Sequence, residues 1–175
     1  MASKVNIHIA GLREIISNID FLRRIQPNLI SIRDNRESPA YDMIDNAGLK
    51  NLLVVNFDDI TEPIPGRYEK VPEENDIKII LEWAKQKMQE NNNEFIVQCT
   101  AGISRSSAVA ILVNYLQDPE NALKVINPML HCPNPKVLEL GDKILNSNIK
   151  EPVKKIMDDT KEQFLANMDK GGSVF

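Results

Sequence analysis

The sequence predicts one α/β domain, with a mainly parallel central sheet flanked by helices. Short apolar runs alternate along the chain with longer segments in which apolar residues recur at helical spacing, an order typical of βαβ units. The chain has 175 residues, which suits one domain because domains commonly contain about 100–200 residues. Helical patterns gather in the C-terminal half.

Composition and charge exclude several functions. The formal net charge is -4, and aromatic residues make up 5% of the chain. Nucleic-acid binding usually needs a basic face or aromatic platforms, so we expect no nucleic-acid partner. No apolar run approaches the roughly 20 residues of a membrane-spanning helix, so we expect no membrane association. The two cysteines form no disulfide framework, and free thiols favour the reducing cytoplasm.

The first third of the chain contains two expected strands and one helix. Residues 5–9 alternate apolar and polar side chains, which predicts a half-buried strand with His8 on its exposed side. Residues 11–25 have the spacing of one amphipathic helix, which Pro27 ends. Residues 29–32 form the next apolar run, and we expect a second strand there.

The segment after the second strand is charged and then apolar. Residues 33–36 read Arg-Asp-Asn-Arg, which we interpret as a solvated turn, with an anion contact as the alternative. A short helix is expected at 39–47, with Gly48 as its stop. Residues 52–57 predict a strand buried on both faces, as in a parallel sheet. The proline-rich residues 61–74 predict a long loop.

The second half is mainly helical. Apolar spacing predicts helices at 74–89, from about 105 to 115, at 120–130 and at 136–145, with a strand ending at Cys99. We take residues 1–150 as the domain and 151–175 as a C-terminal helical tail that ends flexibly at Gly171-Gly172-Ser173. The tail has a weak apolar stripe, which we expect to pack on the domain, with contact to a partner as the alternative.

The cysteine loop, residues 99–105, has the strongest functional pattern in the chain. It joins the strand ending at Cys99 to a helix, so it lies at a strand's carboxyl end, where ligands of α/β proteins collect. Small residues at 101 and 102 let backbone N–H groups turn inward as an anion nest, and the helix adds its positive end. Arg105 supplies a guanidinium that fits a phosphate. The same field favours the Cys99 thiolate, a nucleophile toward a bound phosphoester.

These residues resemble the Cys-x5-Arg signature of the protein tyrosine phosphatases, with Ser106 as the hydroxyl residue that follows the arginine. The string Ala-Gly-Ile-Ser-Arg-Ser at 101–106 is most similar to the dual-specificity branch, and the resemblance spans roughly residues 50–145. It implies a phosphatase-like fold and hydrolysis of phosphomonoesters on phosphorylated proteins through a phosphocysteine intermediate. It implies no metal or other cofactor, and phosphate or sulfate is expected to occupy the loop.

The resemblance also assigns roles. Cys99 attacks phosphorus, and Ser106 donates to the sulfur when it leaves. The phosphate oxygens are bound by the Arg105 side chain and by backbone N–H groups of Thr100, Ala101, Gly102, Ile103, Ser104 and Arg105. The general acid is an aspartate on a loop after a preceding strand, which places Asp59 in that role and Asp58 as its alternate. Asp76 is a third candidate, better explained as a helix-start carboxylate.

Two further positions follow from the resemblance. Related proteins usually carry histidine before the cysteine, whereas this chain has Gln98. Because glutamine carries no charge, we expect a somewhat higher pKa for the Cys99 thiol than in those relatives. Asn134 is expected to brace the cysteine loop by hydrogen bonding.

Other readings of the same residues stay open. The main alternative is an inactive phosphate-binding module that recognises phosphoproteins. A structural role for Cys99 and a rhodanese-like sulfurtransferase are weaker readings, and the neutral side chains inside the loop disfavour a lipid substrate. Cys132 is expected to be a half-buried structural cysteine, with a reversible disulfide to Cys99 as the alternative.

Overall fold

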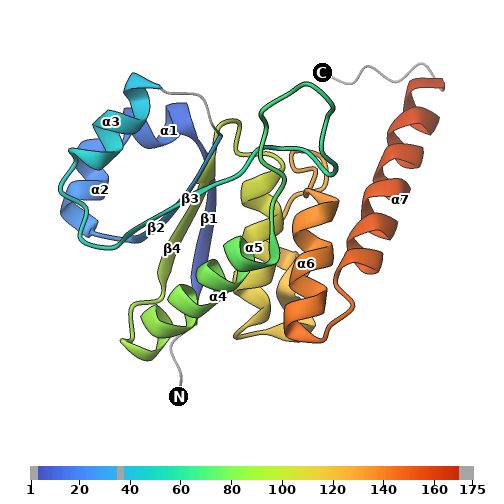
Figure 1. Ribbon diagram of the computed structural model, residues 1–175. Helices are drawn as coiled ribbons and strands as arrows, with labels where there is room; N and C mark the ends of the chain where they lie inside the picture. Colours follow the sequence, from blue (N-terminus) through green and yellow to red (C-terminus); the bar gives the residue numbers. More distant parts are fainter. Residues whose placement is uncertain (1–3, 35–37, 170–175) are drawn as a thin grey trace.

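The computed structural model describes residues 4–34 and 38–169 and contains one four-stranded sheet. The strand order is β1-β4-β2-β3, and all three pairings are parallel (Figure 1). The strands are β1 (Asn6–Gly11), β2 (Asn28–Arg33), β3 (Leu52–Asn56) and β4 (Glu94–Cys99). A single α/β domain with a parallel central sheet is thus confirmed.

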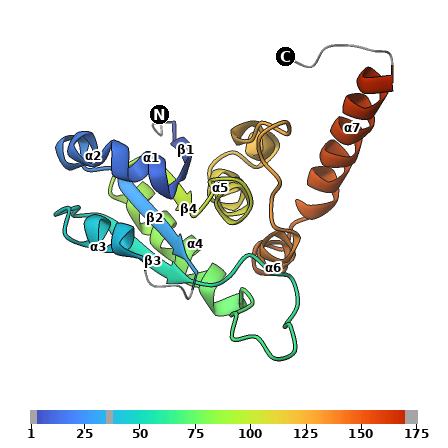
Figure 2. The same ribbon diagram turned by 90° about the horizontal axis from the view of Figure 1, so that it is seen from above.

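Helices cover both faces of the sheet and give three layers (Figures 1 and 2). One face carries α1 (Leu12–Ser17), α2 (Ile19–Ile25) and α3 (Pro39–Asp45). The other carries α4 (Glu74–Gln89), α5 (Arg105–Tyr115), the 3-10 helix η1 (Pro119–Val125) and α6 (Pro135–Leu145), followed by α7 (Lys150–Asp169).

Helix α5 is the centre of the larger hydrophobic core. Its residues from Arg105 to Val113 are all buried, because β1, β4, α4, α6 and η1 surround it. A helix that is apolar on every side is typical of such a position. The burial holds the N-terminal end of α5 firmly against the carboxyl end of β4.

The structure corrects three expected elements. Residues 11–25 form two helices, because Asn18 leaves helical geometry (φ -111°, ψ 14°) and its side chain donates to the Glu14 carbonyl. Strand β3 is an edge strand, so it is only partly buried, with Val54 38% exposed. Of the helix expected at 120–130, the structure has only η1, which begins at Pro119 and ends at Val125.

The charged run at 33–36 suggested a solvated turn, but Arg33 does not lie in one. Its side chain is buried, forms a bidentate pair with the Asp45 carboxylate at 2.9 and 2.6 Å, and lies over the Tyr41 ring. It is therefore not free to take an anion. Asn35 and Arg36 lie outside the described residues.

The C-terminal helix α7 packs at its beginning. Val153 is buried in the larger core, whereas Phe164 and Leu165 are exposed. The glycine-rich segment expected to be flexible, at 171–173, lies outside the described residues. Among the residues that the structure describes, no helix is both long and apolar enough to cross a membrane.

Candidate active site

The cysteine loop turns sharply between β4 and α5 and packs on the end of β1. Gly102 lies in the left-handed region, with φ +74°, and an added Cβ would come within 2.6 Å of the Gly11 nitrogen. Both the backbone angle and the close approach exclude a side chain at this position. The glycine therefore sets the tight curvature of the loop.

The loop presents donors that other residues do not use. Within the described part of the chain, the backbone N–H groups of Ala101, Ile103 and Ser104 donate to no acceptor. Arg105 Nε is buried and also has no partner. A buried donor such as Arg105 Nε is rarely left unpaired in proteins. Gathered at the start of α5, these donors form a site for an anion.

The Arg105 guanidinium is held in place from three sides. Nη1 donates to the Phe57 carbonyl at 2.9 Å, and Nη2 donates to Thr100 Oγ1 at 3.1 Å. Asp34 Oδ2 lies 3.8 Å from Nη2 and accepts from Thr100 Oγ1 at 3.0 Å. These contacts fix the plane of the guanidinium and leave Nε for a ligand. Asp34 was not identified from the sequence as a residue of the site. Its position at the carboxyl end of a strand, where ligands of α/β proteins bind, was the available signal.

The Cys99 thiol is buried at the base of the loop, and its Sγ lies 3.2 Å from Ser106 Oγ. Burial alone pushes the pKa of this thiol up. The Ser106 hydroxyl, the Ser106 and Gly102 amides and the Arg105 charge act in the opposite direction, and together they hold the pKa of Cys99 below its ordinary value. The site therefore favours a thiolate beneath the anion cradle.

The three candidate aspartates have distinct contacts. Asp59 is exposed, and its Oδ1 accepts from Ser104 Oγ at 2.7 Å and from Asn134 Nδ2 at 2.8 Å. Asp58 accepts instead from the Lys70 backbone N–H at 2.6 Å, which anchors the loop after β3. Asp76 belongs to the capping box at the start of α4. Among these three candidates, Asp59 is thus hydrogen-bonded to a side chain of the cysteine loop.

Asn134 links three elements around the site. Its Oδ1 accepts from the N–H groups of Lys136 and Val137 and so caps α6, while its own N–H donates to the Ser104 carbonyl at 3.2 Å. Its amide Nδ2 reaches Asp59. One side chain therefore couples the position of the aspartate to the cysteine loop and to the start of α6.

Cys132 differs from the expectation of a half-buried structural cysteine. It is an exposed free thiol, and its backbone N–H donates to the Ile103 carbonyl at 3.1 Å. The segment before α6 therefore supports the cysteine loop through backbone contacts.

Gln98 belongs to a buried polar chain that sequence reasoning did not find. Ser31 Oγ donates to Gln98 Oε1 at 2.7 Å and accepts from Arg33 Nε at 3.2 Å. Arg33 in turn is held by Asp45 of α3. The chain ties β4, just before Cys99, to β2 and α3. Ser31 is 67 positions away from Gln98, and Arg33 and Asp45 also belong to other elements, so sequence spacing gave no sign of the chain.

A cleft of about 560 Å³ lies beside the guanidinium of Arg105. Its walls include Asp34, Asp59 and the part of the long loop that carries Gly66, Arg67, Tyr68 and Glu69. The side chain of Tyr68 is almost fully exposed. The cleft has room for the group that a bound phosphate would carry.

Comparison with solved structures identifies the fold. The human tyrosine phosphatase-like serine/threonine/tyrosine-interacting protein superposes with a TM-score of 0.57 at 16% identity, covering 80% of this chain and 91% of that one. Human DUSP28 gives 0.54 at 13% identity, covering 90% and 94% of the two chains. PTPMT1, solved in complex with PI(5)P, gives 0.53 at 14% identity, covering 87% and 96%. No protein family model and no curated protein matches the sequence.

The chain therefore has the fold of the cysteine-dependent protein tyrosine phosphatases, and its neighbours include proteins of the dual-specificity-like branch. At these identities the likeness describes the fold, so the chemistry has to be argued from the residues of this chain.

Proposed function

We propose that this protein is a protein phosphatase, acting on phosphotyrosine or with dual specificity, that hydrolyses phosphomonoesters through a phosphocysteine intermediate. One observation carries the proposal. The thiol with a lowered pKa lies in the same loop as four unpaired donors, the amides of 101, 103 and 104 and Arg105 Nε. A nucleophile and an anion cradle in one loop suit attack on a bound phosphate.

In the first step the Cys99 thiolate attacks phosphorus and forms the S–P bond while the ester P–O bond breaks. The Arg105 guanidinium and the loop amides stabilise the charge spread over the equatorial oxygens. The leaving oxygen takes a proton from the Asp59 carboxyl group. Support for this role comes from the position of Asp59, whose Oδ1 is held by Ser104 and Asn134 and which lines the same cleft as Arg105.

In the second step a water molecule attacks phosphorus, and the S–P bond breaks. The Asp59 carboxylate takes a proton from the water, which restores the acid for the next cycle. The Ser106 hydroxyl, at 3.2 Å from the sulfur, stabilises the departing thiolate. Phosphate then leaves the loop. In the absence of substrate, phosphate or sulfate is expected to bind there.

The substrates we propose are phosphorylated proteins of the cytoplasm. Two free cysteines, one of them at the site, suit a reducing compartment. The preference among phosphorylated residues depends on the cleft formed with residues 66–69.

A second candidate is a phosphate-binding module without turnover. Gln98 favours it, because related enzymes usually carry a histidine there, and the buried Nε2 of Gln98 has no partner. One structural neighbour is itself described as tyrosine phosphatase-like and interacting. Such a module would bind phosphoproteins through the same cradle.

Hydrolysis of p-nitrophenyl phosphate separates the two candidates. The enzyme should release p-nitrophenol, the Cys99→Ser variant should release none, and Asp59→Asn should be slowed by about 10²–10⁴. The matched control is Asp58→Asn, which removes a neighbouring carboxylate. Binding of the phosphoester with no turnover by the wild type would establish the module instead.

A further inference from the structure

Strand β1 has an outer edge that the sheet does not use. It is an edge strand, and the Asn6 N–H donates to the Asn93 carbonyl at 2.9 Å, toward β4. In a parallel pair only alternate residues bond to the neighbouring strand, so the backbone groups of Ile7 and Ile9 face away from the sheet. Such a row of donors and acceptors is a template for another strand.

Both ends of this free edge are already covered. Before it, the Val5 N–H donates to Gln117 Oε1 at 2.6 Å. After it, the cysteine loop lies against Gly11, where an added Cβ would be 3.1 Å from the Ala101 carbonyl oxygen. The edge open to a partner is therefore short and fits one extended segment of a few residues.

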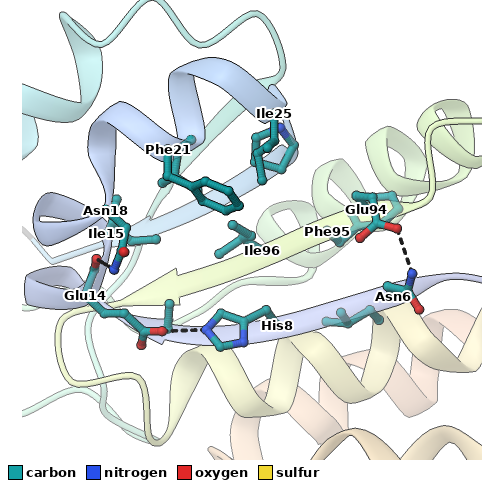
Figure 3. Close-up of a pocket in the computed structure, with 14 residues that line it drawn as sticks. Asn6, His8, Glu14, Ile15, Asn18, Phe21, Ile25, Glu94, Phe95 and Ile96 are labelled. Carbon is teal, nitrogen blue, oxygen red and sulfur yellow. Dashed lines mark hydrogen bonds and ion pairs between the residues drawn. The ribbon is translucent and has the colours of Figure 1, made fainter.

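An apolar groove borders this edge on the face that carries α1 and α2 (Figure 3). Phe21 and Ile25 of α2 are 50% and 48% exposed and lie above Ile96 of β4. The groove has a volume of about 400 Å³, and the paired side chains of His8 and Glu14 lie at its border. An apolar side chain from a segment on the β1 edge would enter it.

The opposite face of the same edge borders a polar hollow of about 370 Å³. Lys4 and Lys124 line it, both exposed and with no ion pair in the described part of the chain. The one carboxylate in its lining, Asp118, is engaged by the backbone and side-chain N–H groups of Asn121. With two lysines against this one carboxylate, the lining has a net positive charge and suits an acidic side chain.

We propose that the outer edge of β1 binds an extended segment of a partner protein in which acidic and apolar residues alternate. Side chains of a strand point to opposite faces in turn, so the apolar ones enter the groove beside Phe21 and the acidic ones meet Lys4 and Lys124. Main-chain hydrogen bonds to Ile7 and Ile9 supply affinity, and the two hollows supply specificity. A second copy of this chain fits less well, because β1 (Asn6–Gly11) carries no carboxylate.

Binding at this edge would place the partner next to the cysteine loop. The Leu12 N–H donates to the Thr100 carbonyl at 3.1 Å, directly after β1. The partner's segment is thus held within a few residues of the proposed active site. Binding at the β1 edge does not depend on catalysis, so the experiment below tests it separately from the proposed function.

The probe is a fluorescein-labelled hexapeptide in which glutamate alternates with leucine, added to the full chain in phosphate buffer that fills the cysteine loop. Fluorescence polarisation should rise and saturate, and a lysine–leucine peptide should bind at least tenfold more weakly. The double variant Lys4→Glu/Lys124→Glu should lose at least tenfold in affinity. Lys85→Glu/Lys154→Glu, which reverses two charges at exposed positions of α4 and α7, is the matched control and should bind as the wild type does.

Amide exchange measured by NMR locates the peptide. Slower exchange at Ile7 and Ile9, with shifts at Phe21, supports the proposal. Equal binding of the two peptides, equal loss in the control variant, or shifts confined to the cysteine loop would overturn it. So would a dimer in light scattering that Phe21→Asp disrupts, because the occupant would then be a second copy of the chain.

Discussion

Replacing Ser106 with alanine tests how the site stabilises the Cys99 thiolate. The change removes the hydroxyl that lies 3.2 Å from the sulfur but leaves the Ser106 and Gly102 amides and the Arg105 charge in place. A hydrogen bond to a charged group contributes about 1.5–3 kcal/mol. Loss of that stabilisation raises the pKa of the thiol and lowers the ratio of thiolate to thiol about tenfold to a hundredfold, since 1.36 kcal/mol corresponds to tenfold.

The assay is the rate of alkylation by iodoacetamide as a function of pH. Below the titration midpoint the rate follows the thiolate population, so Ser106→Ala should react at least about tenfold more slowly than the wild type, with its midpoint at higher pH. Ser107→Ala is the control, because its hydroxyl donates to the Ile103 and Ser104 carbonyls and not to the sulfur. Identical midpoints for wild type and Ser106→Ala would refute the reasoning.

Three further predictions concern the fold and the site. Gly141→Ala would place a Cβ 2.3 Å from a Leu112 methyl carbon, so it should lower the free energy of unfolding by about 1–3 kcal/mol in urea denaturation. Asn134→Ala should lower the free energy of unfolding by about 1 kcal/mol, because the cap of α6 is lost. It should also lower kcat, with little change in KM, because Asn134 holds the proposed acid Asp59; unchanged kcat would contradict this role. Asp45→Ala should destabilise the protein near neutral pH by stranding the buried Arg33. Because the hydrogen bond from Arg33 lowers the pKa of Asp45 from 3.8, the difference from wild type should shrink as the pH falls below that value; a difference that persists in acid would contradict it.

The sequence was most informative where local pattern and tertiary position agree. Strands β2 and β4 are central and buried, so their apolar runs identified them, and α4 and α6 have the apolar spacing of helices packed on one side. The cysteine loop was identifiable because its residues are consecutive. Where burial depends on the place of a strand in the sheet, as for the edge strand β3, the apolar run alone was misleading.

The sequence pattern did not predict the contacts between distant segments of the chain. The charged residues Arg33 and Asp34 suggested a solvated turn, yet both are buried. Arg33 pairs with Asp45, and Asp34 accepts a hydrogen bond from Thr100 of the cysteine loop. The break at Asn18 depends on one side chain competing for a carbonyl, which apolar spacing does not register. Such features follow from the tertiary arrangement of polar groups.

The central claim is that Cys99 becomes covalently phosphorylated during turnover. Mixing the protein with p-nitrophenyl phosphate, quenching rapidly with acid and locating the phosphate by peptide mass spectrometry tests it directly. We expect phosphate on Cys99, at higher occupancy in Ser106→Ala because the thiolate leaves less readily there. Turnover without any phosphate on Cys99, or with phosphate on another residue, would contradict the claim.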